Sequence, residues 1–503
     1  MEKHSFIARV PDQPGSLHRA AEILTRYSGN INRIQFDRRI DPYTVFFEVT
    51  ASEESYRRIT EDLNALGYLQ SSLQPLSFLK FYVTIPHRSG ALSDFLEYTT
   101  SCKANIAFID FDDKGRYPDR LTISLNLENS AGADRLLDQL KSRYRIEILE
   151  YDNSGLHLDD TVFYLRFAQN IREIIGESED RFLMRLLGDI NHIAQELMNL
   201  GQDPRQAFES VLVTGRTLKA TTGSGFYADV QKIQAGKDIT VYCFQPPCGG
   251  SIYLLEAPGE AVMIDTGYGI YYREVSAMIR HYAPEALKKL SRIIITHADA
   301  DHCGAGSHYK VPALMHPGTL KIIRVANRAY GSRSEESILE EVYTTMINLF
   351  SGFAPSDEIQ VVPTEPLAMR GIFPVIFKFA LGGVEFEILE GMGGHTFGMI
   401  FVYAPSVGLL FTSDTVINFE HLTPERAKYN SLAVFLVTSV NVDSDLAKKE
   451  RRALLELADT TPIGPGSGHP CLICGGHGPV SVISGKKLVP WGAVERYRGT
   501  DAC

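Results

Sequence analysis

The stretch Thr-His-Ala-Asp-Ala-Asp-His at residues 296–302 decides the fold of the C-terminal half of the chain. It directly follows an apolar run that indicates a buried strand, and a glycine follows it closely. Alternate residues of an extended segment face one side, so we expect its first three ligand-type side chains to converge, with the fourth at the next turn. Such a density of ligand types predicts a metal site. The four residues are His297, Asp299, Asp301 and His302.

Four further segments each place one ligand-type residue at the end of an apolar run or in a glycine turn. In chain order these residues are Asp265, His395, Asp414 and His477. The whole set combines imidazole and carboxylate groups, which are ligands of divalent metals in proteins. Two adjacent cations would also neutralise the clustered carboxylates.

Together these five segments resemble the metallo-β-lactamase superfamily, over about residues 226–495. The resemblance implies an αββα sandwich that collects metal ligands at the strand ends of both sheets. By motif, it implies one ion on His297, Asp299 and His395, a second on Asp301, His302 and His477, a bridge through Asp414, and outer support from Asp265. His469 competes with His477 for the last place, but Gly-His-Gly-Pro after an apolar stretch matches the family better.

One departure from the family concerns Asp299, which stands where most members have histidine. A hard oxygen donor in place of nitrogen shifts the expected metal from zinc toward iron or manganese. In this respect the chain resembles the di-iron branch, which includes the flavodiiron proteins and whose motif usually has Glu. We therefore expect two divalent metal ions per chain, with iron favoured and zinc and manganese as alternatives. A second departure is an insertion, Leu320 to Phe379, with a helical stretch near Glu335 to Phe350 that could cover the site.

Three functions remain open. In a hydrolase, the two cations lower the pKa of a bridging water and present the metal-bridged hydroxide to a carbonyl or phosphoryl centre of a small-molecule substrate. Asp301 would then orient the nucleophile and Asp414 would bridge, so both are candidate catalytic residues. A di-iron oxygen-binding protein, redox protein or oxygenase would use the same ligands and need an external electron donor. A metal-bearing sensor without turnover is the third.

The N-terminal 150 residues contain an internal repeat, in which Gly15 corresponds to Gly90 and Asn30 to Asn105. Each copy runs from an apolar strand through a Pro/Gly turn to a helical stretch and a second strand, the opening of a βαββαβ unit. Both copies resemble the ACT domain, a ferredoxin-like module that senses small molecules. The resemblance implies an amino-acid ligand near these four residues. The alternative is that the glycines only make the turn.

These patterns divide the chain into four parts. They predict ACT-like domains at residues 1–75 and 76–152, a helical connector at 153–225 and an α/β metal domain at 226–503. Our hypothesis is that an amino-acid effector biases the metal domain through the connector. Because ACT-like modules commonly pair, we also expect a homo-oligomer.

Composition excludes several partners. The formal net charge of −11, without a Lys/Arg-rich tract, argues against nucleic acid. The sequence has no run of about 18 apolar residues and no signal segment, so we expect a cytoplasmic protein that does not bind membranes. The seven cysteines are irregularly spaced, which argues for reduced thiols. Cys471 and Cys474 have the spacing of a redox pair, with ordinary buried thiols as the alternative.

Overall fold

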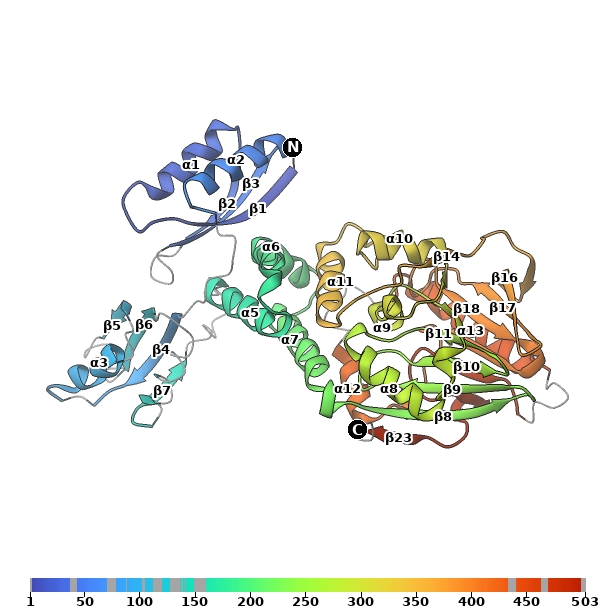
Figure 1. The fold of residues 1–503 in the computed structure, drawn as a ribbon. Coiled ribbons are helices and arrows are strands. Elements are labelled where there is room, and N and C mark those ends of the chain that lie inside the picture. The colour runs from blue at the N-terminus through green and yellow to red at the C-terminus, as the bar shows by residue number, and fades with distance from the viewer. Residues whose placement is uncertain are drawn as a thin grey trace. The chain divides into compact units, whose positions relative to one another are not determined.

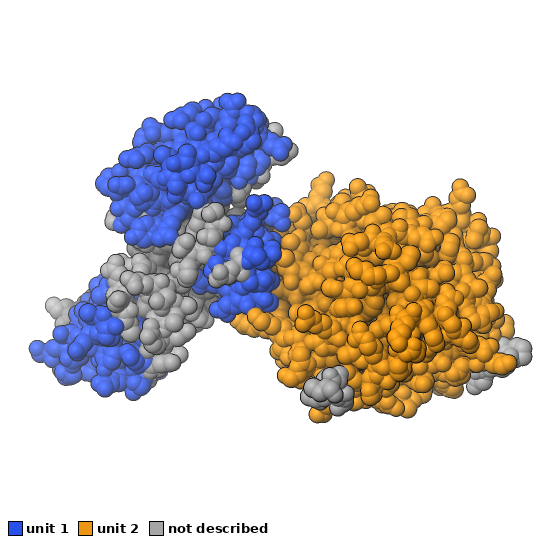
Figure 2. Space-filling model, in the orientation of Figure 1, with its two compact units in different colours: residues 1–195 blue, residues 196–503 orange. Residues whose placement is uncertain are grey.

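The computed structural model describes most of the chain in two compact units, residues 1–195 and 196–503 (Figure 2). The described residues are 2–36, 43–69, 78–86, 88–101, 105–111, 120–126, 136, 139–140, 142–148, 160–432, 440–462 and 469–498. Each unit is described by itself below.

Unit 1 contains two small antiparallel sheets (Figure 1). The first has the order β1-β3-β2 and is built from β1 (Glu2–Arg9), α1 (Ser16–Arg26), β2 (Asn30–Gln35), β3 (Thr44–Ala51) and α2 (Glu53–Ala65). The second has the order β5-β6-β4-β7 and is built from β4 (Phe78–Thr84), α3 (Ala91–Ser101), β5 (Asn105–Asp110), β6 (Arg120–Asn126) and β7 (Arg145–Ile148). Both modules open with strand, helix and two strands, as the sequence repeat predicts. Their assignment as ACT-like modules stays a prediction.

Gly15 and Gly90 occupy equivalent turns in the two modules. Each directly precedes a helix, α1 or α3, and their φ values are +86° and +84°. This left-handed conformation favours glycine. A Cβ at either position would meet nothing within 4 Å, so the backbone conformation, not a close neighbour, requires glycine here. Asn30 and Asn105 begin β2 and β5. A ligand role for these four residues stays a prediction.

Three helices lie where the sequence predicts a helical connector: α5 (Asp160–Ile175), α6 (Asp180–Asn199) and α7 (Pro204–Ala220). Helix α7 belongs to unit 2, where the Thr221 Oγ1 lies 2.5 Å from the Tyr271 hydroxyl. The expected boundaries at 75/76 and 152/153 fall outside the described residues. Among the described helices, none combines the length and the apolar character needed to cross a bilayer.

Unit 2 is built on two eight-stranded sheets (Figure 1). The first has the order β14-β13-β12-β11-β10-β9-β8-β23 and comprises β8 (Tyr227–Ala235), β9 (Ile239–Gln245), β10 (Ile252–Ala257), β11 (Glu260–Ile264), β12 (Leu290–Ile294), β13 (Ala313–Met315), β14 (Ile359–Val361) and β23 (Glu495–Arg498). The second runs in chain order and comprises β15 (Ala368–Arg370), β16 (Phe373–Leu381), β17 (Val384–Glu390), β18 (Ile400–Ala404), β19 (Leu409–Ser413), β20 (Leu472–Gly475), β21 (Ser481–Ser484) and β22 (Lys487–Pro490).

The two sheets pack face to face with a helix on each outer side. One apolar core joins both sheets, with side chains such as Val241 from the first and Val402 from the second. A second core joins the outer face of the second sheet to Leu454 of α13 (Ser444–Thr460). On the outer face of the first sheet, Tyr282 of α8 (Tyr272–Tyr282) lies near Phe244 of β9, with 6.3 Å between ring centroids. This is the αββα layering that the sequence predicts.

The insertion, Leu320 to Phe379, contributes helices and edge strands to this sandwich. It contains the end of α10 (Pro317–Val325), all of α11 (Ile338–Phe350), β14, β15 and most of β16. The sequence predicts a helix from about Glu335, but α11 begins later, because the Ser337 side chain accepts a hydrogen bond from Leu339 N and caps the first turn.

A buried ion pair fixes α12 (Pro424–Ser431) against the first sheet. The Arg426 guanidinium contacts the Asp229 carboxylate and donates to the carbonyls of Pro246, at 2.8 Å, and Gln245. Both charged side chains are buried. Removing one partner of a buried pair is destabilising, because the other charge loses part of its compensation. Here Arg496 Nε, which lies 2.7 Å from Asp229 Oδ1, would remain.

We therefore expect Arg426→Ala to lower the free energy of unfolding by about 3 kcal/mol. Chemical unfolding of the full chain, followed by circular dichroism, measures this loss. As a control, Lys288→Ala removes an exposed partner of Glu285 and should change the free energy by less than about 1 kcal/mol. If the two variants unfolded at the same denaturant concentration, the expectation would be contradicted.

Candidate metal centre

The ligand-bearing loops meet at one edge of the sandwich. Asp265 directly follows β11 and His297 follows β12, and these strands are parallel neighbours. In the other sheet, Asp414 directly follows β19 and His477 follows β20, again a parallel pair. Parallel neighbours bring their carboxyl ends to the same sheet edge, which is where such folds place ligand-binding residues. The remaining segment is the loop after β17, which carries His395.

The sequence predicts an extended segment from His297 to Asp301, but in the structure a helix begins at Ala300. Asp299 is the N-cap of the short helix α9 (Ala300–Cys303), and its carbonyl accepts a hydrogen bond from the His302 amide at 2.9 Å. Asp301 and His302 therefore lie on a helical turn. This turn separates the four side chains into two pairs, His297 with Asp299 and Asp301 with His302, because the extended backbone ends at Asp299.

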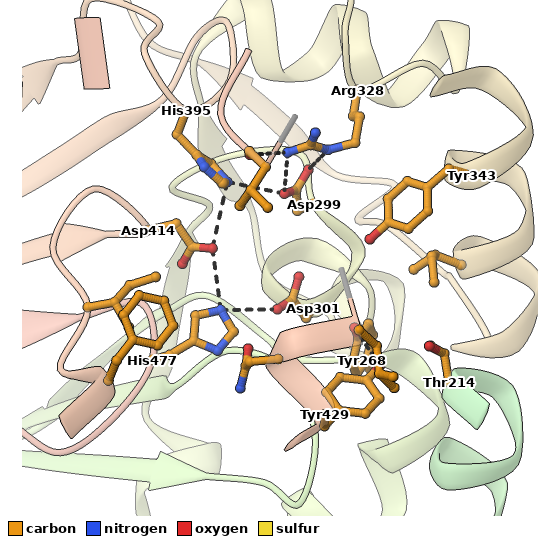
Figure 3. A pocket seen from close by; sticks show the side chains of 16 residues that line it. Thr214, Tyr268, Asp299, Asp301, Arg328, Tyr343, His395, Asp414, Tyr429 and His477 are labelled. Carbon is orange, nitrogen blue, oxygen red and sulfur yellow. Dashed lines mark hydrogen bonds and ion pairs between the residues drawn. The ribbon is translucent and has the colours of Figure 1, made fainter. Parts of the chain in front are cut away.

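The structure gathers six of the predicted ligands into two adjacent groups. Figure 3 shows His395 and Asp414 of the first group and Asp301 and His477 of the second. Within each group the ligand atoms lie within 4.8 Å of one another, and the groups are His297, His395 and Asp414, and Asp301, His302 and His477. The Asp414 carboxylate faces both. Its Oδ2 lies 3.6 Å from His395 Nε2 and 3.3 Å from His477 Nε2, and its Oδ1 lies 3.1 Å from His302 Nε2. This is the position that a bridging ligand requires.

Asp299 lies beside the first group, where the sequence places it. Its Oδ2 is 3.2 Å from His395 Nε2 and 3.5 Å from His297 Nε2. A carboxylate oxygen thus faces two imidazole nitrogens. All seven predicted ligands are therefore together at this edge of the sandwich.

Several ligand atoms are buried without a hydrogen-bond partner among the described residues. They are His297 Nε2, His302 Nε2 and Asp414 Oδ1. His302 Nε2 and Asp414 Oδ1 lie 3.1 Å apart but lack the geometry of a hydrogen bond. Buried polar atoms are normally hydrogen-bonded, so these atoms require another partner. Imidazole nitrogen and carboxylate oxygen are ligands of divalent cations. The residues present therefore fit a pair of divalent metal ions.

Asp265 orients the ligands from behind, as the resemblance implies. Its carboxylate accepts hydrogen bonds from His302 Nδ1 at 2.7 Å and from the amide and hydroxyl of Thr296, both at 2.8 Å. The bond to Nδ1 leaves His302 Nε2 facing the site. The Asp265 backbone has φ +60°, a left-handed conformation that aspartate tolerates better than most residues.

The charges around the ligands influence one another strongly. Burial alone would raise the pKa of Asp299, but the Arg328 guanidinium and the two facing histidines hold it well below its usual range. Burial alone would lower the pKa of His302, but the carboxylates of Asp414, Asp301 and Asp265 raise it well above its usual value. Ionised carboxylates are the form that binds metal, so the Asp299 carboxylate is ready for a cation at neutral pH.

Two glycines permit the ligands to lie this close to the backbone. A Cβ on Gly476 would lie 1.8 Å from Asp414 Oδ1, and a Cβ on Gly250 would lie 2.5 Å from the His302 ring. Both distances are far below van der Waals contact, so any side chain here displaces a ligand. Neither position belongs to the predicted ligand set, although Gly475 and Gly476 directly precede the ligand His477 and were a usable signal.

Two residues that the sequence analysis missed hold the His395 loop. Asn441 Oδ1 lies 3.0 Å from His395 Nδ1, which leaves Nε2 directed at the site. The buried Glu450 carboxylate accepts hydrogen bonds from the backbone amides of Met392 and Gly394, the second at 3.0 Å. Both residues are near or on α13, far along the chain from the loop, so no local pattern indicates them.

We expect Asn441→Ala to weaken metal binding by roughly 10- to 100-fold, the usual effect of losing a residue that orients a histidine ligand. Titration of the metal-free full chain with Zn²⁺ measures this change. Asn64→Ala, at an exposed position of α2 in unit 1, is the matched control and should bind as the wild type does. An unchanged affinity in Asn441→Ala would show that His395 needs no such support.

A cavity of about 120 Å³ opens beside the ligands (Figure 3). Besides the metal ligands, its polar lining residues are Thr214, Tyr268, Arg328, Tyr343, Tyr429, Asn430. Thr214 comes from α7, whereas Arg328 and Tyr343 come from the insertion, so the insertion forms a wall of the cavity. The Tyr268 and Tyr429 hydroxyls lie 3.1 Å apart. These residues belong to no ligand motif, so no sequence pattern indicates them.

The competing histidine and the paired cysteines lie away from both ligand groups. His469 packs near Trp491, with 6.2 Å between ring centroids, and its Nδ1 lies 2.8 Å from the Pro470 carbonyl. Cys471 belongs to the core beneath α13 and Cys474 to the core between the sheets, so they lie on opposite faces of β20. Both are free thiols, and burial raises the pKa of Cys471 to about 11. This environment is that of ordinary buried thiols.

Comparison with known proteins covers the C-terminal half. Residues 245–463 match the family model described as "Metallo-beta-lactamase superfamily". No curated protein matches the chain.

Solved structures with a similar fold include metallo-beta-lactamases of two bacteria. The one from Pontibacter korlensis is 16% identical, covers 50% of this chain and 92% of its own, with a TM-score of 0.31. The one from Erythrobacter litoralis is 13% identical, and the match covers 50% of this chain and 90% of that protein, with a TM-score of 0.31. A metallo-beta-lactamase family protein from Thermus thermophilus is 16% identical, and the match covers 47% of this chain and 70% of that protein, with a TM-score of 0.30.

The family match spans four of the five ligand segments, from Asp265 to Asp414. The remaining ligand, His477, lies outside the matched residues. It follows β20, which is the parallel neighbour of β19, the strand that ends just before Asp414. Residues 245–463 are a domain of the metallo-β-lactamase superfamily.

Proposed function

We propose that unit 2 is a dinuclear metal-dependent hydrolase that acts on a small molecule. The observation that carries this proposal is the Asp414 carboxylate, whose two oxygens face the two ligand groups at 3.1 to 3.6 Å. Two ions bridged in this way would supply a water of lowered pKa and neutralise charge that develops on the substrate.

The protein side chains beside the ligands would orient the reactants. Asp301 lines the cavity and its Oδ2 lies 3.5 Å from His477 Nε2, so it is positioned to hold a water molecule by hydrogen bonding. Burial raises the pKa of Tyr268 and of Tyr343, so both hydroxyls stay protonated and can donate to a substrate oxygen. The cavity volume favours a substrate whose reacting part is about the size of benzene, which fills an engineered cavity of roughly 150 Å³.

Hydrolysis by the metal-loaded full chain tests the proposal. The substrates are small esters, thioesters, lactams, phosphodiesters and sulfate esters, each with Zn²⁺, Mn²⁺ or Fe²⁺. We expect turnover of at least one class, its loss with a chelator, and its reduction by about 10²-fold or more in Asp301→Asn. Two bound ions without hydrolysis of any class would contradict the proposal and favour a metal-bearing sensor.

A second candidate function is di-iron oxygen chemistry, and Asp299 is the observation that favours it. This carboxylate adds a hard oxygen donor beside His297 and His395. Anaerobic purification with metal analysis and Mössbauer spectroscopy distinguishes the two functions. Two irons per chain would support oxygen chemistry with an external electron donor, whereas two zinc ions would exclude it. Asp299→His should move the metal preference toward zinc.

We also propose that an amino acid binds unit 1 and regulates the metal domain. The support is the matching left-handed glycines, Gly15 and Gly90, at equivalent turns of two repeated modules. Calorimetry with the full chain should detect saturable binding of at least one amino acid. Absence of binding across all twenty would contradict the regulation but leave the hydrolase proposal intact.

A further inference from the structure

Arg328 is a buried cation that lies against one metal ligand and is held there by other parts of the fold. It lies in the segment between α10 and α11 and is only 5% exposed. Figure 3 shows its guanidinium pointing at Asp299 on the wall of the cavity. An arginine side chain stays charged at every pH that a protein meets.

The position of Arg328 does not depend on Asp299. Its Nη2 donates to the Val440 carbonyl at 2.9 Å, and its Nη1 lies 3.8 Å from the carboxylate of Glu340, a buried residue of α11. Its backbone amide donates to Thr344 Oγ1, also on α11, at 3.2 Å. The guanidinium is thus held by Val440 and Glu340 in addition to its contact with Asp299.

The contact between Arg328 and Asp299 is side-on and long. Nε lies 3.5 Å from Oδ1 and Nη2 lies 3.4 Å from Oδ2. Close charged pairs of this kind usually lie at about 2.7 to 2.9 Å. The same Oδ2 is 3.2 Å from His395 Nε2. Asp299 therefore lies between a fixed cation on one side and the first ligand group on the other.

The second ligand group has the opposite charge environment. Among the described residues, no Lys or Arg forms an ion pair with Asp301. The Asp301 carboxylate instead lies near His302 and His477. In addition, Asp265 accepts from His302 Nδ1 at 2.7 Å, which increases the electron density on that imidazole. The second group is thus more negative than the first, although both share Asp414.

We propose that Arg328 is a positioning residue that makes the two metal sites unequal. It offsets the charge of Asp299 and so weakens ion binding by His297, Asp299 and His395, while the site of Asp301, His302 and His477 binds its ion more tightly. This inference rests on the proposed two-ion site. Its consequence is that the free metal concentration sets whether one ion or two are bound.

Titration of the metal-free full chain with Zn²⁺, against a competing chelator, tests this inference. The wild type should bind two ions with affinities that differ by at least about tenfold. Arg328→Met removes the charge and keeps the length, so it should tighten the weaker site by roughly 10- to 100-fold and leave the stronger site unchanged. Arg328→Lys retains the charge and should keep most of the difference.

The Asp299→Asn background isolates the pair. There, adding Arg328→Met should tighten the weaker site by a smaller factor than in the wild type, because only the direct repulsion between Arg328 and the ion is then removed. Arg328→Met leaves the buried Glu340 carboxylate without its arginine, and the variant could fail to fold for that reason. In that case the double variant Arg328→Met, Glu340→Gln is used in the same comparison.

The outcomes separate the inference from the function on which it rests. Weakening of both sites by Arg328→Met, or equal affinities in the wild type, overturns the inference alone. Failure of the wild type to bind any ion overturns the inference and the proposed function together.

Discussion

Replacing Asp414 with alanine is expected to remove both metal ions and abolish hydrolysis. Its Oδ1 lies 3.1 Å from His302 Nε2, and its Oδ2 lies 3.3 and 3.6 Å from the Nε2 atoms of His477 and His395. No other carboxylate faces both ligand groups among the described residues of the site. We expect metal content to fall from two ions to less than one per chain, and turnover to fall by at least about 10² to 10³-fold.

Metal analysis after dialysis, with circular dichroism to verify folding, measures the effect of Asp414→Ala. Asp445→Ala is the matched control, because Asp445 is an exposed aspartate that pairs with Lys448 on α13. The control should keep two ions and full turnover. Retention of both ions by Asp414→Ala would show that the two ligand groups do not share a bridge.

Gly476→Ala is expected to have nearly as large an effect, although it removes no ligand. The new Cβ would lie 1.8 Å from Asp414 Oδ1 and 2.9 Å from the Asp414 amide nitrogen. The side chain and the backbone of the bridging residue would both have to move. We expect loss of at least one ion and a fall in turnover of about 10²-fold, since a shift of about 1 Å at a reacting centre has this effect.

Gly259→Ala separates this close approach from a general effect of replacing glycine. Gly259 has φ +84°, and a Cβ there would meet nothing within 4 Å. We expect that variant to be less stable but to bind two ions. Thermal unfolding and metal analysis of both variants make the comparison. Normal metal content in Gly476→Ala would contradict the geometry described for Asp414.

That these seven side chains lie together could be predicted from the sequence, whereas their role as metal ligands stays a prediction. Each ligand ends an apolar run or lies in a glycine turn, and the strand pattern brings such positions to one edge of the sandwich. The part of this prediction that was wrong is the extended conformation from His297 to Asp301. The carbonyl of Asp299 begins a helical turn at this point, and hydrophobic alternation in so short a stretch does not distinguish the two conformations.

The surroundings of the ligands could not be predicted, because they depend on contacts between distant segments. Arg328 meets Asp299 across 29 residues, and Asn441 meets His395 across 46. Neither position has a sequence pattern that differs from an ordinary loop. The same holds for Thr214, which reaches the cavity because α7 packs with unit 2. Such contacts are specified by tertiary packing and not by local periodicity.

The metal content of the purified full chain tests the central claim most directly. We predict two divalent ions per chain by elemental analysis. Anomalous scattering from crystals should place one ion between His297, Asp299 and His395 and the other between Asp301, His302 and His477, with Asp414 between them. A protein that binds no more than trace metal after incubation with Zn²⁺, Mn²⁺ and Fe²⁺, or that holds its ions elsewhere, would contradict the account.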